Sequence, residues 1–292
     1  MIPFTLVACN FRYYAHSSSL SHSSPISSSL SHTAFASIEP FFSLLTGIFL
    51  SQKMKQFWSP SSINKNKAMV ENLQNHGIVT SDEVAKAMEA VDRGVFVTDR
   101  SSAYVDSPMS IGYNVTISAP HMHAMCLQLL EKHLKPGMRV LDVGSGTGYL
   151  TACFAVMVGA EGRAIGVEHI PELVASSVKN IEASAASPFL KEGSLAVHVG
   201  DGRQGWAESA PYDAIHVGAA APEIPEALID QLKPGGRLVI PVGNIFQDLQ
   251  VVDKNSDGSV SIKNETSVRY VPLTSREAQL RGADEYARCT DE

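Results

Sequence analysis

The chain has 292 residues, of which 44% are hydrophobic and 18% are charged, a composition typical of one sizeable globular α/β domain with an appended segment. The 23 Lys and Arg residues and 30 Asp and Glu residues give a formal net charge of -7. No long basic run occurs, so nucleic acid is not expected as a partner. The four cysteines are scattered without a Cys-x-x-Cys pair or a nearby His cluster. This pattern argues against zinc and a disulfide scaffold, so we predict no metal and free thiols, with Cys126 and Cys153 in the core.

Residues 1–53 differ in composition from the rest of the chain. They are rich in serine from Ser17 to Ser31, and Arg12 is the only basic residue before position 53. Such a segment cannot build a core, and its serine-rich, acid-poor character resembles an organelle transit peptide. Because a mitochondrial presequence would carry more arginine, the prediction is a chloroplast leader on an otherwise cytoplasmic protein. The other interpretation is a disordered or alternatively translated leader, with Met54 as a start.

A folded domain is expected at 54–281, followed by a flexible tail at 282–292. The apolar piece at 41–50 is too short to cross a bilayer, which takes about 20 residues, so no membrane partner is expected. Before the first strand, hydrophobic spacing predicts helices at 64–76, 80–91 and 120–133. Turn residues predict a long loop at 104–116. The second helix begins with a capping box from Thr80 to Glu83. Long loops in compact domains are usually functional.

An apolar run that ends in an acid and three alternating glycines lies in the middle of the chain, from Val140 to Gly148. It predicts a strand, a tight turn and a helix over 149–157. The glycines let the chain reverse and let a ligand approach the backbone. Dinucleotide-binding folds place the third glycine one position later, so the spacing favours S-adenosylmethionine over NAD. An ordinary strand-to-helix turn is the remaining interpretation.

Strands and helices then alternate along the chain. The pattern predicts strands at 163–168, 195–199, 212–217 and 236–242, and helices at 171–185 and 222–232. Strands separated by helices of this length indicate β-α-β units and a doubly wound, mostly parallel α/β sheet. Segments 249–253 and 260–271, joined across a turn at 255–258, predict a C-terminal antiparallel hairpin at the edge of the sheet.

Acidic residues stand at two successive strand ends, close to the expected position of the glycine turn. In open parallel sheets the ligand lies at the carboxyl ends of the strands, where the strand order reverses. Glu168 is placed to accept hydrogen bonds from both hydroxyls of a ribose. Asp201 and the Gly202 N–H can read the edge of an adenine. A single strand-end acid is more often a helix cap, but two beside a glycine turn favour an adenosine site.

Five segments of the chain carry a family resemblance. They are Ile117-Ser118-Ala119-Pro120-His121-Met122-His123, Leu141-Asp142-Val143-Gly144-Ser145-Gly146, Val199-Gly200-Asp201-Gly202, Tyr212-Asp213-Ala214-Ile215-His216-Val217-Gly218 and Leu232-Lys233-Pro234-Gly235-Gly236-Arg237. Together they resemble the protein-L-isoaspartate (D-aspartate) O-methyltransferase family. The first is the most specific, because many methyltransferases share the glycine motif. The resemblance runs from about residue 63 to 279. It implies a Rossmann-like class I S-adenosylmethionine-dependent methyltransferase fold that methylates isoaspartyl residues of damaged proteins, which begins their repair.

The resemblance also implies the residues that contact S-adenosyl-L-methionine. Carried over by motif, they are Val115, Thr116, Ile117, Ser118, His123, Gly144, Ser145, Gly146, Glu168, His169, Asp201, Gly202, Thr274 and Gln279. Relatives often have aspartate at position 168, so the longer glutamate changes the geometry of the expected ribose contact. The tail after Arg281 departs from the family.

The chemistry of the implied substrate explains why no catalytic dyad is evident. An α-carboxylate has a pKa of about 3.3–3.7, so it is charged at neutral pH and needs no general base. A hydroxyl can orient it without neutralising it, and Ser118 is the predicted catalytic residue. The alternative for Ser118 is a helix cap before Pro120. Two residues apart on a helix, His121 and His123 face different ways, so shared metal ligation is not expected; His123 is predicted to line the cofactor site and His121 alternatively lies in the core.

Two other functions remain open from the sequence. An NAD-dependent oxidoreductase would share the glycine turn and the acid after the second strand, but no hydride-transfer constellation is evident. An adaptor that binds isoaspartyl peptides without methylating them would keep the same fold. We expect a monomer, because the charged hairpin edge offers no evident apolar patch.

Overall fold

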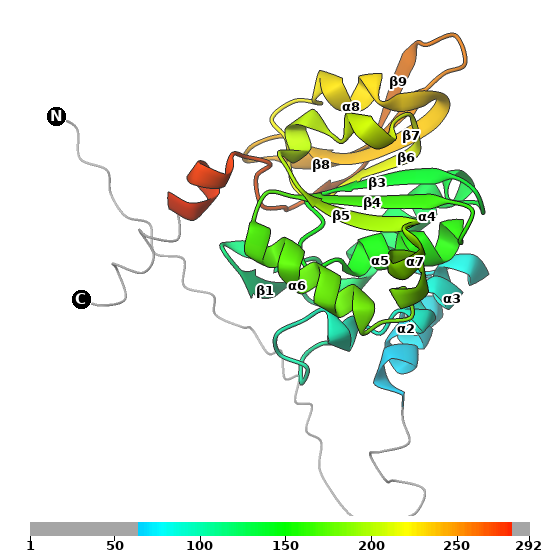
Figure 1. Ribbon diagram of the computed structural model, residues 1–292, viewed down its shortest axis with the longest axis vertical. Coiled ribbons are helices and arrows are strands. Elements are labelled where there is room, and N and C mark those ends of the chain that lie inside the picture. The colour runs from blue at the N-terminus through cyan, green and yellow to red at the C-terminus, as the bar shows by residue number, and fades with distance from the viewer. Residues whose placement is uncertain (1–63, 282–292) are drawn as a thin grey trace, which may run out of the picture. The chain divides into compact units, whose positions relative to one another are not determined.

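The computed structural model describes residues 64–281 (Figure 1). The predicted leader at 1–53 and tail at 282–292 lie outside these residues, as do Cys9 and Cys289. No helix between residues 64 and 281 is long and apolar enough to cross a membrane. Cys126 and Cys153 are buried free thiols, as predicted.

A seven-stranded sheet forms the centre of the described domain, in the order β5-β4-β3-β6-β7-β8-β9. The strands are β3 (Arg139–Val143), β4 (Arg163–Glu168), β5 (Leu195–Val199), β6 (Tyr212–Val217), β7 (Leu232–Val242), β8 (Gln247–Lys254) and β9 (Val260–Val268). β3 to β7 are parallel, and β8 and β9 are antiparallel. The predicted doubly wound sheet with a C-terminal hairpin is therefore confirmed. The strand order reverses at β3, which pairs with β4 on one side and β6 on the other.

Helices lie on both sides of this sheet, and the first of them packs on the second and not directly on the sheet (Figure 1). They are α2 (Lys65–Asn75), α3 (Asp82–Ala90), α4 (Pro120–Leu130), α5 (Tyr149–Val158), α6 (Pro171–Glu182), α7 (Ser187–Glu192) and α8 (Glu226–Asp230). Short 3-10 helices occur at Arg93–Val95, Glu131–His133, Gly202–Gln204 and Ala207–Ser209.

The two faces of the sheet bury separate cores because successive side chains of a strand point to opposite sides. Val140 and Ala164 belong to one core, which contains residues of α2 to α6. Leu141 and Ile165, their neighbours along β3 and β4, belong to the other core with Leu228 of α8. Strands that are buried on both faces read as continuous apolar runs. For this reason β4 and β6 have the bounds predicted from the sequence. The edge strand β5 is only partly buried, and it also has its predicted bounds.

The predicted loop at 104–116 is wrong in part, because it contains most of a hairpin outside the main sheet. β1 (Met109–Gly112) pairs antiparallel with β2 (Val115–Ile117). The two residues between them, Tyr113 and Asn114, have φ values of 54° and 57°. A two-residue hairpin turn with φ positive at both central positions suits the twist of the flanking strands. The expected turn formers are present, and they connect two short strands.

Three helix predictions also need correction. The N-cap of α3 is Ser81, whose Oγ accepts from Val84 N–H at 3.3 Å, while Thr80 Oγ1 bonds to Gln128 instead. α6 ends at Glu182, before the separate helix α7. The predicted helix at 222–232 shrinks to Glu226–Asp230, because Pro225 is the N-cap and a proline disfavours helical geometry in the residue before it. β7 correspondingly begins at Leu232, which pairs with Tyr212.

Candidate active site

The glycine turn lies between β3 and α5, at the position where the strand order reverses. Gly144, Gly146 and Gly148 have φ values of 71°, 53° and 89°, in the left-handed region that favours glycine. A Cβ at Gly148 would also collide with the Ser177 side chain on α6. The turn is therefore shaped by its glycines, and α5 begins directly after it.

Glu168 is fixed beside this turn at the end of β4. Its side chain is 4% exposed. Oε2 accepts the Gly146 N–H at 3.1 Å, and Oε1 accepts the Ile170 N–H at 3.0 Å. A carboxylate has about four acceptor sites, so these two bonds orient the group and leave acceptor capacity for a ligand. The predicted acid and the glycine turn are brought together directly.

A first hollow opens at this edge of the sheet. Seven of the predicted cofactor residues line it, namely Val115, Gly144, Glu168, His169, Gly202, Thr274 and Gln279. The segment around Thr274 is held against the sheet, because Ala220 N–H donates to Val271 O at 2.8 Å and Leu273 N–H donates to Ala220 O at 2.7 Å.

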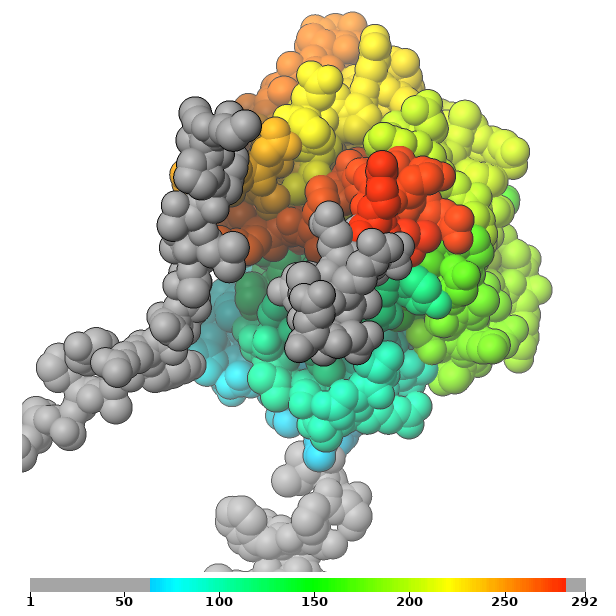
Figure 2. Space-filling model, turned by 90° about the vertical axis from the view of Figure 1, so that its left-hand side faces the viewer, coloured from blue at the N-terminus to red at the C-terminus, as the bar shows by residue number. Residues whose placement is uncertain are grey.

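The C-terminal part of the described chain is tied to the β1–β2 hairpin. The Gln279 side chain donates to the carbonyls of Tyr113 and Asn114 at 3.1 and 3.2 Å. Asn114 Nδ2 donates in return to Gln279 O at 3.1 Å. Figure 2 shows the C-terminal segment in red on the same face of the molecule as the blue-green hairpin region. Two segments that are far apart in the sequence thus border the first hollow together.

A second hollow lies on the other side of Gly144 and Gly218, which line both cavities. Its wall contains the other predicted residues Thr116, Ile117, Ser118, His123, Ser145 and Gly146. Ser145 Oγ and Thr147 Oγ1 are buried there without a hydrogen-bond partner among residues 64–281. Buried polar groups in native proteins are nearly always paired. The donor set of this hollow therefore suits a ligand with polar ends, such as an amino acid moiety.

Ser118 faces the second hollow and does not cap the helix that follows. The N-cap of α4 is Ala119, with no side-chain capping bond, so the capping role is wrong. Ser118 also lines an adjoining groove with Tyr270. Burial raises the pKa of Tyr270 well above its ordinary value, and a hydrogen bond with the Ser118 hydroxyl opposes that rise. Ser118 is thus half-buried at the junction of the hollow and an open groove.

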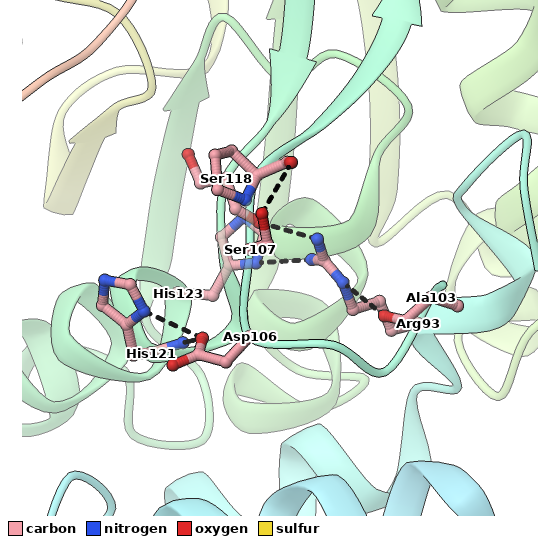
Figure 3. A network of polar contacts seen from close by, with 8 residues as sticks. Arg93, Ala103, Asp106, Ser107, Ser118, His121 and His123 are labelled. Atoms are coloured by element: carbon pink, nitrogen blue, oxygen red, sulfur yellow. Dashed lines mark hydrogen bonds and ion pairs between the residues drawn. The ribbon is translucent and has the colours of Figure 1, made fainter. Parts of the chain in front are cut away.

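The two histidines of α4 point to different surroundings (Figure 3). His121 has a side chain that is 41% exposed and lies 2.8 Å from Asp106 Oδ1 through Nδ1, so a core position for His121 is wrong. His123 is buried, and its Nδ1 lies 3.2 Å from Nη1 of Arg93. Within residues 64–281 there is no group of three or more His, Cys, Asp or Glu side chains that could hold a metal ion.

Asp201 differs from its predicted role in one respect. It lies at the end of β5, and Gly202 lines the first hollow, but the Asp201 side chain does not. Both of its oxygens bind the Arg203 guanidinium, with the shortest distance 2.7 Å. This ion pair holds the pKa of Asp201 below its ordinary value. Sequence reasoning overlooked Arg203, although it stands only two positions along the chain. The adenine contact of Asp201 stays a prediction.

A buried ion pair in the wall of the second hollow was not anticipated from the sequence. Asp142 Oδ1 lies 2.8 Å from His216 Nδ1, and Thr151 Oγ1 donates to the other Asp142 oxygen at 2.5 Å. Burial alone lowers the pKa of His216, but hydrogen bonds to Asp142 and Cys126 outweigh it and raise the pKa to about 10. The signal was present, since Asp142 and His216 occur in recognised motifs, but only the β3–β6 register places them opposite each other.

Comparisons with known proteins agree with this geometry. A family model described as protein-L-isoaspartate (D-aspartate) O-methyltransferase matches residues 64–278. Protein-L-isoaspartate O-methyltransferase 1 of Arabidopsis thaliana is 99% identical over 229 residues, which cover 78% of this chain and 100% of that protein. The Caenorhabditis elegans protein-L-isoaspartate O-methyltransferase is 49% identical over 75% of this chain and 96% of its own. A solved Plasmodium falciparum structure, described as a protein-L-isoaspartate O-methyltransferase in complex with S-adenosyl-L-homocysteine, has a TM-score of 0.67 and 38% identity, covering 73% of this chain and 99% of that one.

Proposed function

Because the chain belongs to the protein-L-isoaspartate (D-aspartate) O-methyltransferase family, we propose that it methylates free carboxylates in damaged proteins, namely the α-carboxylate of L-isoaspartyl residues and the side-chain carboxylate of D-aspartyl residues. The methyl donor is S-adenosyl-L-methionine. The methyl ester of an isoaspartyl residue then collapses to a succinimide, which reopens in part to normal aspartate. The observation that carries this proposal is the pair of hollows that meet at Gly144 and Gly218, with Glu168 fixed in one and Ser118 bordering the other.

The residues present fit the donor in both hollows. In the first, the Glu168 carboxylate is oriented to accept from a ribose, and Gly202 N–H is available to an adenine ring nitrogen, with Asp201 beside it. In the second, the wall from Thr116 to Ser118 and Ser145 Oγ, which has no hydrogen-bond partner among residues 64–281, suit the amino acid end. Thr274 and Gln279 line the first hollow, and we propose that they contact the same end of the donor from there. When bound, the sulfonium supplies an electrophilic methyl group. Val115, His123, His169 and the turn glycines complete the proposed contacts.

The chain's own residues orient the nucleophile in this proposal and need not deprotonate it. The substrate α-carboxylate is charged at neutral pH, since its ordinary pKa is about 3.3–3.7. Ser118, half-buried between hollow and groove, would donate a hydrogen bond that aims one carboxylate oxygen for direct in-line displacement. Enclosure between the bound donor and the walls of the hollow would exclude water from two charges that neutralise each other as they react.

The deciding experiment is transfer of a labelled methyl group to an isoaspartyl peptide, with the aspartyl peptide of the same sequence as control. We expect label on the isoaspartyl peptide alone. Calorimetry should show binding of S-adenosyl-L-homocysteine and none of NAD. Label on neither peptide, with S-adenosyl-L-homocysteine still bound, would favour an adaptor that binds without turnover. NAD binding would favour the oxidoreductase.

The proposal also covers the oligomeric state, the partners and the location of the protein. We propose a monomer that binds isoaspartyl polypeptides and has neither nucleic acid nor a membrane as partner, in keeping with its net charge of -7. Residues 1–53 would decide between cytoplasm and chloroplast. A fusion of this segment to a fluorescent reporter tests the latter, and a purely cytosolic signal would contradict it. Sedimentation at micromolar concentration tests the monomer.

A further inference from the structure

Arg93 is a fully buried cation that has no carboxylate partner among residues 64–281. Its side chain is 0% exposed, in the short 3-10 helix Arg93–Val95. Its guanidinium donates to Ala103 O at 2.9 Å from Nε and to Ser118 O at 2.8 Å from Nη2. Nη1 contacts His123 Nδ1 at 3.2 Å (Figure 3). Burying a charge is costly unless its hydrogen bonds are satisfied. These three contacts satisfy the cation, and the question is what its burial at this place achieves.

The contact with His123 decides where the proton of that imidazole lies. A guanidinium has five N–H donors and no acceptor. His123 Nδ1 must therefore accept with its lone pair, which leaves the ring proton on Nε2 in the neutral form. Burial, reinforced by the positive charge of Arg93 and then by His216 and His121, holds the pKa of His123 well below its ordinary value. The groups around the ring thus favour a neutral imidazole with an Nε2–H.

The free side of this imidazole belongs to the second hollow. The ring lines that hollow together with Ser118 and Ser145. Nε2 has no hydrogen-bond partner within the described part of the chain, and it is not among the fully buried unpaired atoms. It therefore remains accessible from the cavity. His123 thus offers one N–H donor to the second hollow at a fixed position. Arg93, which contacts the other ring nitrogen, stays protonated and cannot transfer a proton to it.

We propose that Arg93 is a positioning residue that holds the Ser118 backbone and fixes His123 as a neutral Nε2–H donor to a carboxylate bound in the second hollow. A neutral donor orients a carboxylate without protonating it. The carboxylate belongs either to the amino acid end of the methyl donor or to the isoaspartyl substrate. This identification of the ligand rests on the proposed function, whereas the tautomer does not.

Nitrogen-15 NMR of histidine in the wild-type protein tests the tautomer directly. We expect His123, assigned by its loss in His123→Gln, to show an unprotonated Nδ1 and a protonated Nε2 at neutral pH. A protonated Nδ1 or an imidazolium would overturn the proposal. This measurement needs neither substrate nor turnover, so it stands apart from a failure of the methylation assay.

Arg93→Lys tests the positioning role, because lysine keeps the charge but cannot reach all three acceptors. The matched control is Arg237→Lys, since Arg237 donates to Leu129 O at 2.9 Å and to Asp253 but lines neither hollow. We expect Arg93→Lys to mix the His123 tautomers and lower kcat/KM about 10- to 100-fold, the range for a lost hydrogen bond to a charged group. Equal losses in the two folded variants, or an unchanged tautomer, would overturn the role.

Two binding measurements identify the carboxylate. Weaker binding of S-adenosyl-L-homocysteine to His123→Gln than to wild type, with an unchanged peptide KM, would assign it to the donor. A raised KM for the isoaspartyl peptide with unchanged S-adenosyl-L-homocysteine affinity would assign it to the substrate. If His123→Gln changes neither the S-adenosyl-L-homocysteine affinity nor the peptide KM, Nε2 does not donate to a ligand and the proposal is overturned. If Arg93→Lys does not fold, the wild-type tautomer and His123→Gln still decide the proposal.

Discussion

The buried and the exposed acids of the candidate site are held in different ways. We call the buried acids Asp142 and Glu168 with their partners the floor of the site, and the exposed pair Asp201–Arg203 its rim. On the floor, Asp142 and Glu168 have side chains 1% and 4% exposed, and their bonds go to fixed backbone N–H groups or to buried side chains. On the rim, the Asp201 side chain is 38% exposed and its partner Arg203 is 43% exposed. A buried carboxylate with satisfied bonds is pre-oriented, whereas an exposed ion pair is screened and can exchange partners. We therefore expect floor residues to control affinity and rim residues to adjust it.

The largest effect is expected from Glu168→Gln on the floor. The amide NH2 would face the N–H of Gly146 or Ile170 in place of an acceptor, which disturbs the turn as well as the ribose contact. We expect S-adenosyl-L-homocysteine affinity measured by calorimetry to fall about 100-fold, as for loss of a strong charged hydrogen bond. The control is Glu172→Gln, an exposed acid in the first turn of α6. Affinity within twofold of wild type would remove Glu168 from the site.

Ser118→Ala should affect turnover more than affinity or stability. The hydroxyl lines the hollow but caps no helix, so its loss should leave the melting temperature nearly unchanged. We expect kcat for an isoaspartyl peptide to fall about 30-fold, because misdirected reacting groups lose up to about 100-fold. The control is Ser107→Ala, because the Ser107 hydroxyl donates to the neighbouring Pro108 carbonyl at 3.3 Å and lines neither hollow. Full activity with a lowered melting temperature would leave Ser118 a structural role alone.

The floor pair Asp142–His216 predicts a pH dependence of stability. The pKa of His216 is raised in the folded state to about 10, against about 6.5 when unfolded. The stabilisation is therefore fully present below about pH 6.5 and is lost as pH rises through about 10. Urea unfolding should show the difference between wild type and His216→Gln shrinking from pH 6 to pH 10. A difference that grows over this interval would mean that His216 is neutral in the folded protein.

The sequence predicted the floor better than the rim or the proposed positioning residue Arg93. Buried parallel strands such as Arg163–Glu168 carry an apolar run that ends at the ligand edge, so their ends and Glu168 could be placed. Glycine chemistry placed the turn in the same way. Arg93 could not be assigned, because its partners Ser118 and His123 lie 25 and 30 positions away and meet it only in the tertiary structure. The extent of α8 was missed because Pro225 was taken as part of a helix that it begins.

The smallest effects are expected at the rim, and they test whether the Asp201–Arg203 pair competes with the ligand. Arg203 occupies both Asp201 oxygens in this structure, so an adenine amine must share or replace those bonds. Asp201→Asn should weaken S-adenosyl-L-homocysteine binding about three- to tenfold, the range for one modest hydrogen bond. Arg203→Met should leave affinity unchanged or raise it by up to about fivefold, since exposed ion pairs contribute little. If Arg203→Met instead weakens binding more than Asp201→Asn does, Arg203 itself contacts the ligand, and the rim recognises it through the cation.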